Sequence, residues 1–188
     1  MKKLARGAFV VCVDGGANIA ANAGITPDII IGDMDSVLSA VKKAFQSCRR
    51  LKSDYQDNSD FDKALNFVTA QKFKQITIVC ATGNRLDFTL SNLYASFKYL
   101  KKTDIVFKSA KWDIYPINKT TKFAAKKGAR VSLIPVTKCT GLSLSGLKYP
   151  LKNAALNPLE TLTVSNAAIG KKIEVKIKKG NLLVYIEK

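Results

Sequence analysis

Histidine is absent from this chain of 188 residues. Its absence excludes histidine general bases, Ser-His-Asp triads, histidine-containing zinc sites and enzymes that form a phosphohistidine intermediate. Long apolar runs are missing too, because none approaches the roughly 18 residues that a membrane-spanning helix needs. We therefore expect no membrane partner for this protein.

Cysteine is scarce, and the four cysteines are too widely spaced to form a Cys-x-x-Cys or zinc-knuckle motif. Cys12 and Cys80 lie inside apolar runs, so we interpret them as buried thiols in a reducing compartment. The start, Met1-Lys2-Lys3, faintly resembles a signal peptide, but the apolar stretch after it is short and ends at Asp14. These observations predict a cytoplasmic protein.

The two common glycine-rich nucleotide motifs do not occur in the sequence. There is no Gly-x-x-x-x-Gly-Lys-Ser/Thr, so the chain is not a P-loop enzyme, and no Gly-x-Gly-x-x-Gly dinucleotide fingerprint. The pair Gly15-Gly16 is a weak signal by itself. It fits either a close approach of the backbone to a ligand or a tight turn.

Acidic residues are few, since 14 Asp and Glu oppose 31 Lys and Arg, giving a formal charge of +17. A lysine-rich solvated surface explains this charge most simply; attraction of an anion, such as a nucleotide phosphate, is the functional interpretation. The basic residues are scattered among expected strands and turns rather than gathered on one helix or tract. That distribution argues against a nucleic-acid partner.

The first hundred residues alternate between apolar runs typical of buried strands and segments with helical spacing. Strands are expected at Phe9–Val13, Ile29–Ile31 and Ile76–Cys80, and continuous apolar runs of this kind are typical of a parallel sheet covered on both faces. From about residue 109 short alternating runs replace this pattern. We expect an α/β domain with a Rossmann-like parallel sheet over residues 1–108, followed by a smaller all-β domain over residues 109–188.

Most of the acidic residues in the first half follow expected strands, as Asp14, Asp33 and Asp35 do. The loops after parallel strands share one edge of the sheet, where ligands bind. Two carboxylates about 4 Å apart repel by about 4 kcal/mol at an effective dielectric of about 20, so converging carboxylates need a cation. Without histidine or cysteine nearby, the oxygen ligands indicate Mg²⁺, or Mn²⁺, rather than zinc. Asp also favours turns and helix caps, and Asp28, Asp54 and Asp62 are better explained by such roles.

Seven short segments, taken in order, resemble the thiamine pyrophosphokinase family over about residues 9–188. They are Asp14-Gly15-Gly16-Ala17-Asn18, Thr26-Pro27-Asp28, Gly32-Asp33-Met34-Asp35-Ser36, Gln56-Asp57-Asn58-Ser59-Asp60 with Lys63-Ala64-Leu65, Gly83-Asn84-Arg85-Leu86-Asp87, Gly146-Leu147-Lys148-Tyr149-Pro150-Leu151 and Ser165-Asn166. Any one of these motifs is weak, but their order is specific. The resemblance implies an α/β catalytic domain, a β-sandwich domain that binds thiamine, and a homodimer.

The resemblance also implies a reaction: the terminal diphosphate of ATP passes to the thiamine hydroxyl, and AMP is released. Attack at phosphorus needs in-line positioning and charge neutralisation more than covalent help, which a His-free site rich in Asp and Lys can supply. By their positions in the motifs, the residues with expected roles are Asp33, Asp35 and Asp60 as magnesium ligands, Asp14, Gln56, Ser59, Lys63 and Arg85 as ATP or phosphate contacts, and Asp87, Ser165 and Asn166 on the thiamine side. Asp33, Asp35, Asp60 and Asp87 form the expected catalytic set.

The sequence departs from the family pattern in four places. Phe88 stands where the family often has His, and Ser59 replaces the usual Thr but keeps a hydroxyl. Alanines follow Ser165-Asn166 where some relatives have an aromatic residue, so stacking on thiamine is expected from elsewhere, with Tyr149 and Trp112 as candidates. The family normally has a further strand and loop before Asp14's strand. We expect either a shortened chain or a natural variant that lacks part of the nucleotide pocket.

Two alternatives to this function stay open from the sequence. One is another Mg²⁺-dependent pyrophosphokinase or phosphotransferase that uses the same scaffold on a different alcohol. The other is a basic nucleic-acid-binding protein, whose affinity would fall steeply with salt. Clustered carboxylates argue against the second alternative, because they repel phosphate unless a cation lies between them.

Overall fold

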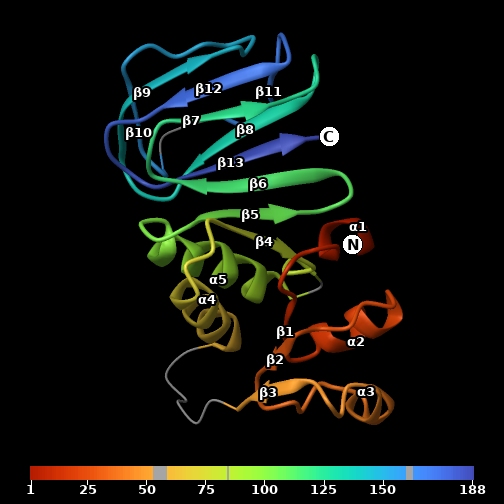
Figure 1. The fold of residues 1–188 in the computed structure, drawn as a ribbon. Coiled ribbons are helices and arrows are strands. Elements are labelled where there is room, and N and C mark those ends of the chain that lie inside the picture. The colour runs from red at the N-terminus through yellow and green to blue at the C-terminus, as the bar shows by residue number, and fades with distance from the viewer. Residues whose placement is uncertain (53–58, 84, 160–162) are drawn as a thin grey trace. The chain divides into compact units, whose positions relative to one another are not determined.

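The computed structural model describes residues 1–52, 59–83, 85–159 and 163–188. It divides into two compact units, Met1–Lys72 and Phe73–Lys188, which are treated separately below (Figure 1). No helix among the described residues is long and apolar enough to cross a membrane. All four cysteines are free thiols; Cys12 is buried as expected, but the expectation is wrong for Cys80, which is exposed at the end of a strand.

The first unit is built on a short parallel sheet in the order β1-β2-β3. Cys12 of β1 pairs in register with Ile30 of β2, which pairs with Arg50 of β3. The bounds are α1 Lys2–Ala5, β1 Val11–Val13, α2 Gly16–Asn22, β2 Ile29–Ile31, α3 Ser39–Ala44, β3 Arg49–Leu51 and α4 Asp60–Ala70. The continuous apolar β2 is buried at every position, as expected for a central strand covered on both faces.

Alternation along the strands sends side chains to two different cores. Cys12 and Ile30 pack with α2 and α3, in a cluster that includes Ala17 and Val41. Ile29 and Ile31 point the other way and pack against α4. Helices therefore cover both faces of the small sheet, with α2 and α3 on one side and α4 on the other (Figure 1).

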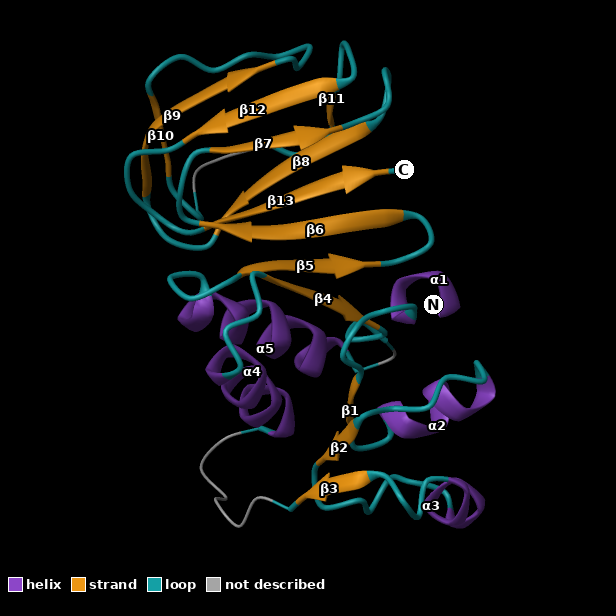
Figure 2. Cartoon of the chain, viewed as in Figure 1, coloured by secondary structure: helices purple, strands orange, loops and turns teal. Residues whose placement is uncertain are grey.

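The second unit is rich in strands and contains two sheets (Figure 2). A six-stranded sheet has the order β11-β8-β13-β6-β5-β4, and a four-stranded sheet has the order β10-β9-β12-β7. The bounds are β4 Gln75–Val79, α5 Leu86–Ser96, the 3₁₀ helix η1 Phe97–Tyr99, β5 Asp104–Lys108, β6 Trp112–Ile117, β7 Thr121–Ala124, β8 Arg130–Pro135, β9 Cys139–Ser145, β10 Ala154–Leu156, β11 Asn166–Ala167, β12 Lys172–Lys176 and β13 Leu182–Glu187. Inward-facing residues of both sheets, such as Leu133, Leu142, Val175 and Val184, form one apolar core between them.

The expected mixture of an α/β part and a β-rich part is confirmed. The six-stranded sheet, however, runs across residue 108, where the change of sequence pattern suggested a domain boundary. β4 and β5 pair in parallel, as expected, but β5 then pairs antiparallel with β6. A tight turn joins those two strands, with the Ser109 amide donating to the Trp112 carbonyl. The division into domains 1–108 and 109–188 stays a prediction.

Candidate functional site

In the first unit, Asp14 after β1 and Asp60 at the start of α4 lie together around Gly32, which follows β2. The Asp14 amide donates to the Ile31 carbonyl at 2.9 Å, and the Gly32 amide donates to Leu51 at 3.3 Å. A Cβ atom on Gly32 would lie 3.1 Å from the Asp14 Cβ and 3.2 Å from the Asp60 Oδ2. Gly32 also has φ +137°, a conformation that side-chain-bearing residues rarely adopt.

The Asp14 carboxylate has one oxygen that is buried and unused. Its Oδ1 is buried and has no hydrogen-bond partner among the described residues. A buried acceptor without a partner costs about 1–3 kcal/mol, and more when it is charged. This oxygen could therefore bind a cation or accept a hydrogen bond from a ligand.

Asp60 begins α4, where two local interactions hold it. The Ser59 hydroxyl accepts a hydrogen bond from the Asp62 amide at 3.2 Å, which makes Ser59 the N-cap of the helix. One turn on, Lys63 Nζ lies 3.0 Å from the Asp60 Oδ1 in a partly buried ion pair. Asp60 Oδ2 is the oxygen that faces Gly32. Lys63 therefore places a positive charge directly beside the acidic edge.

Asp33 and Asp35 lie in the turn after β2 and are both exposed. The Asp35 amide donates to the Asp33 Oδ1 at 2.9 Å, so one carboxylate already shapes its own turn. Met34, between them, has φ +71° and is buried in the core beneath α2 and α3. The turn thus displays two carboxylates on either side of an anchored apolar side chain.

These residues fit a hard divalent cation by their chemistry. The donors are carboxylate oxygens, and one of them is buried with no partner in the described part of the chain. Mg²⁺ commonly takes only one or two carboxylates together with waters and phosphate oxygens. Over the described ranges, however, no group of three or more acidic, histidine or cysteine side chains is assembled for a metal. The structure brings Asp14 and Asp60 together and leaves Asp33 and Asp35 on the neighbouring exposed turn.

In the second unit, Arg85 and Asp87 form a bidentate ion pair at the start of α5. Arg85 Nε and Nη2 donate to the two Asp87 oxygens at 3.0 and 2.6 Å. The hydrogen bonds from Arg85 lower the pKa of Asp87 to about 2. Arg85 also lies over the ring of Phe88, 4.5 Å from its centroid. The pair is exposed, and Asp87 is an acceptor at neutral pH, not a proton donor.

The Asn166 side chain, expected on the thiamine side, is occupied by backbone groups. Its Oδ1 accepts from the Tyr149 amide at 3.0 Å and its Nδ2 donates to the Tyr149 carbonyl at 2.7 Å. Asn166 is buried, while Tyr149 is 61% exposed. Ser165 has φ +64°, and its amide donates to Ser132. Asn166 therefore holds the backbone of an exposed aromatic residue in place.

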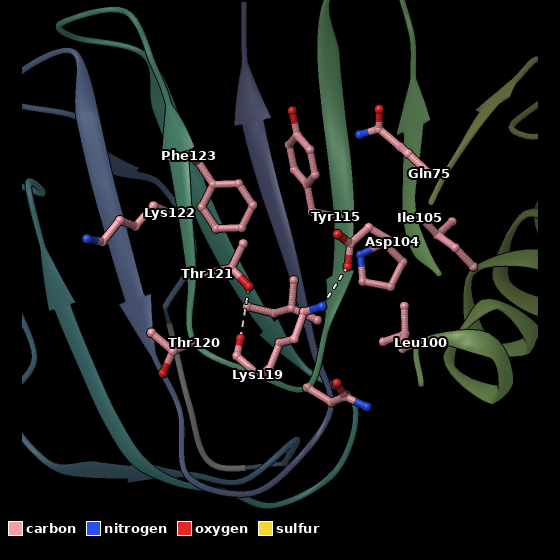
Figure 3. A pocket seen from close by; sticks show the side chains of 13 residues that line it. Gln75, Leu100, Asp104, Ile105, Tyr115, Lys119, Thr120, Thr121, Lys122 and Phe123 are labelled. Carbon is pink, nitrogen blue, oxygen red and sulfur yellow. Dashed lines mark hydrogen bonds and ion pairs between the residues drawn. The ribbon is translucent and has the colours of Figure 1, made fainter. Parts of the chain in front are cut away.

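A cavity of about 480 Å³ in the second unit contains none of the residues selected from the sequence. Figure 3 shows Tyr115 and Phe123 on one side and the Lys119–Asp104 ion pair, at 2.8 Å, on the other. Burial, with Asp113 nearby, raises the pKa of Tyr115 to about 12. Polar groups that line the cavity bind one another, as Lys119 does with Asp104 and Thr121 with the Lys119 carbonyl. The cavity therefore adds nothing to the candidate site.

The sequence selected most residues of the acidic edge but gave no role to Asn18, whose side chain contacts the turn that carries Asp33 and Asp35. Its place at the end of the Asp14-Gly15-Gly16 segment is the only signal that the sequence offers for it, and that signal does not indicate a contact with the later turn. Gln56, an expected ATP contact, lies outside the described residues, as does Asn84 of the loop before Asp87.

Comparison with known proteins identifies two adjoining family models along the chain. The model described as thiamin pyrophosphokinase, catalytic domain, matches residues 1–107, and the vitamin B1 binding domain of the same enzyme matches residues 115–182. The thiamine pyrophosphokinase of Bacillus subtilis is 28% identical over 179 residues, covering 92% of this chain and 84% of that protein. Its crystal structure superposes with a TM-score of 0.85 at 27% identity, covering 95% of this chain and 86% of that one. The Geobacillus thermodenitrificans thiamin pyrophosphokinase structure gives a TM-score of 0.84 at 26% identity, with coverage of 95% and 85%.

Proposed function

This chain belongs to the thiamin pyrophosphokinase family, and from that premise we propose that it transfers the terminal diphosphate of ATP to the hydroxyl of thiamine, with Mg²⁺, and releases AMP. It is an enzyme that forms thiamine diphosphate from thiamine. The observation that carries this conclusion is the presence of both family domains, in order, on one chain. ATP is the co-substrate of the family; the use of Mg²⁺ is our proposal.

The acidic edge of the first unit is the proposed metal and phosphate site. Asp33, Asp35 and Asp60 would hold Mg²⁺, as the sequence predicts, and we add to them Asp14, which the sequence placed among the ATP contacts. Two observations support this assignment: the Asp14 Oδ1 has no hydrogen-bond partner among the residues that the structure describes, and Asp14 lies close to the Asp60 carboxylate. When bound, Mg²⁺ supplies charge neutralisation for the polyphosphate and its leaving group.

Phosphate contacts are proposed for the cations beside these carboxylates and in the loop before α5. Lys63 is held near the acidic edge by its ion pair with Asp60, which supports a role toward the transferred phosphates. Arg85 has a planar fork suited to phosphate, but Asp87 occupies that fork in the absence of ligand. Gln56 and Ser59 complete the proposed set, although the Ser59 hydroxyl already caps α4.

Thiamine contacts are proposed for Asp87, Ser165 and Asn166. Thiamine carries a fixed positive charge on its thiazolium ring, and the low pKa of Asp87 keeps an anion available to it. Asn166 keeps one amide hydrogen beyond the bonds described above, because a side-chain amide has two N–H donors. Tyr149 is exposed beside it and offers a ring face for stacking.

Several broader features also remain proposals. We propose a homodimer, a cytoplasmic location, a Rossmann-like arrangement of the parallel strands, and a β-sandwich for the thiamine-binding domain. The two sheets that share one core in the second unit support the last of these.

The deciding experiment measures nucleotide products from ATP and Mg²⁺ with and without thiamine. We expect AMP and thiamine diphosphate in equal amounts, and no AMP when thiamine is omitted. A panel of other alcohols, tested in parallel, identifies the acceptor. Release of ADP, or AMP formation that does not depend on thiamine, would overturn the proposed function.

A further inference from the structure

Asn18, on α2, makes two hydrogen bonds to the loop that follows β2. Its Nδ2 donates to the Ser36 carbonyl at 2.8 Å, and its Oδ1 accepts from the Leu38 amide at 3.0 Å. We propose that Asn18 is a positioning residue that fixes the Asp33–Ser36 turn, and with it the Asp33 and Asp35 carboxylates, for diphosphate transfer. This inference rests on the proposed function, because it assumes that those carboxylates serve that reaction.

The chemistry of the two bonds requires an asparagine-like side chain. The loop presents one carbonyl acceptor and one amide donor, two residues apart, as a β-strand edge does. A short side chain that carries both a donor and an acceptor can meet both groups at once, and the amide of Asn does so. Asp would keep only the bond to the Leu38 amide, and Ala would keep neither.

Close packing beside Asn18 shows that the turn sits directly on the start of α2. A Cβ atom on Gly15 would lie 3.3 Å from the Ser36 Cβ, so the glycine leaves room for the turn. Met34 is buried beneath α2 and α3 and anchors the turn from inside. At the exit of the turn the Val37 amide donates to the Met34 carbonyl, and Asn18 holds the residues on either side of Val37 to α2.

The position of Asn18 separates this role from core packing. Asn18 is only half-buried, whereas its neighbours Ala17 and Ala20 lie in the core. Removing its amide therefore leaves the apolar contacts of α2 intact. The cost falls on the placement of the turn, and a displacement of about 1 Å near reacting groups can lower the rate by about 100-fold.

The test compares Asn18→Ala and Asn18→Asp with Asn22→Ala, a matched control at an exposed asparagine one turn along the same helix. The first measurement is hydrogen exchange of the Leu38 amide in ligand-free protein, followed by NMR. We expect exchange about 10-fold or more faster in Asn18→Ala, and rates near wild type in Asn18→Asp and Asn22→Ala.

The second measurement is steady-state kinetics of thiamine diphosphate formation with the same variants. We expect kcat to fall by about 10- to 100-fold in Asn18→Ala and less in Asn18→Asp, with the KM for thiamine unchanged and Asn22→Ala like wild type.

Unchanged protection of Leu38, or an unchanged kcat in Asn18→Ala, would overturn the inference. If Asn18→Ala fails to fold, Asn18→Asp must still lower kcat at wild-type KM. A wild-type enzyme without activity would instead refute the proposed function, and the exchange data would still test the two bonds.

Discussion

The acidic edge of the first unit and the polar loops of the second unit use their charges in different ways. At the acidic edge, Asp14 keeps a buried oxygen without a partner in the described structure and lies near a second carboxylate. In the second unit, Arg85 and Asp87 satisfy each other, and the Asn166 amide is bound to the backbone of Tyr149. At the acidic edge, a bound cation would satisfy the charge of the carboxylates. In the second unit, the charged and polar side chains already satisfy each other or the backbone.

This contrast suggests a division of labour between charge and shape. An unpaired carboxylate oxygen is costly until a cation arrives, so it favours binding of metal and phosphate. A preformed loop with an exposed aromatic ring binds a flat, partly apolar molecule with little rearrangement. We therefore expect substitutions at the acidic edge to affect turnover, and substitutions in the second unit to affect stability and the affinity for thiamine.

The largest effect is expected from Asp14→Asn. The substitution keeps the shape of the side chain but removes its charge, so kcat should fall by about 100- to 1,000-fold. The melting temperature should stay the same or rise, because the substitution removes the charge from a carboxylate whose buried Oδ1 has no partner among the described residues. Enzyme assays and thermal unfolding measure the two quantities.

Asp28→Asn is the matched control for Asp14→Asn. The Asp28 Oδ2 accepts a hydrogen bond from the Val10 amide at 2.6 Å, so its role is structural. This variant should keep kcat within about twofold of wild type at a temperature where it remains folded. If both variants retained activity, the contrast between the two regions would fail.

Gly32→Ala should have the next largest effect. A Cβ atom there would press on Asp14 and Asp60, at 3.1 and 3.2 Å, in a conformation that alanine adopts poorly. We expect a loss of about 1–3 kcal/mol in the free energy of unfolding and a fall in kcat. Gly16→Ala is the control, since nothing lies within 4 Å of a Cβ atom at that position. Equal behaviour of the two variants in denaturant titrations and assays would contradict the proposed crowding of the acidic edge.

The sequence predicted the parts of the acidic edge that depend on local patterns, and not those that depend on long-range contacts. The positions of Asp14 and Gly32 at one edge follow from two apolar strands that run parallel. The contact of Asn18 with Ser36 spans 18 residues and depends on how α2 packs, which no local pattern reports.

The second unit shows the same limit in another form. The spacing of Ser165-Asn166 marked a candidate ligand contact, but a sequence does not tell whether an amide faces a ligand or the backbone of Tyr149. The turn from β5 into β6 lies where the sequence pattern changes, and that pattern does not report that β5 and β6 pair in one sheet.

Asn166→Ala tests the second region, and we expect a smaller effect on turnover than at the acidic edge. The variant loses two hydrogen bonds to partly buried backbone groups of Tyr149, which should lower the free energy of unfolding by about 1–3 kcal/mol. The KM for thiamine should rise while kcat changes little, because the tyrosine loop is no longer fixed. A variant with wild-type stability and a reduced kcat would place Asn166 among the reacting groups instead.

The smallest effect concerns the pH dependence of Asp87. Hydrogen bonds from Arg85 are the chief cause that lowers the pKa of Asp87 to about 2. Any stability that this shift contributes is therefore present above the unfolded pKa of about 3.9, and it is lost as the pH falls through the folded pKa. Arg85→Met should raise the Asp87 midpoint toward about 3.9 in an NMR titration. Because the pair is exposed, the loss of stability at pH 6 to 9 should be small and should not vary with pH over that range. An unshifted midpoint would show that Arg85 does not hold this carboxylate.

The central claim is that the acidic edge of the first unit holds a divalent cation against the phosphates of ATP. Electron paramagnetic resonance of Mn²⁺, titrated into the protein with ATP, tests this claim directly. We predict a protein-bound Mn²⁺–ATP signal in wild type, at least about 10-fold weaker affinity in Asp14→Asn and Asp60→Asn, and no change in Asp104→Asn, whose carboxylate pairs with Lys119 in the second unit. Wild-type affinity in both Asp14→Asn and Asp60→Asn would contradict it.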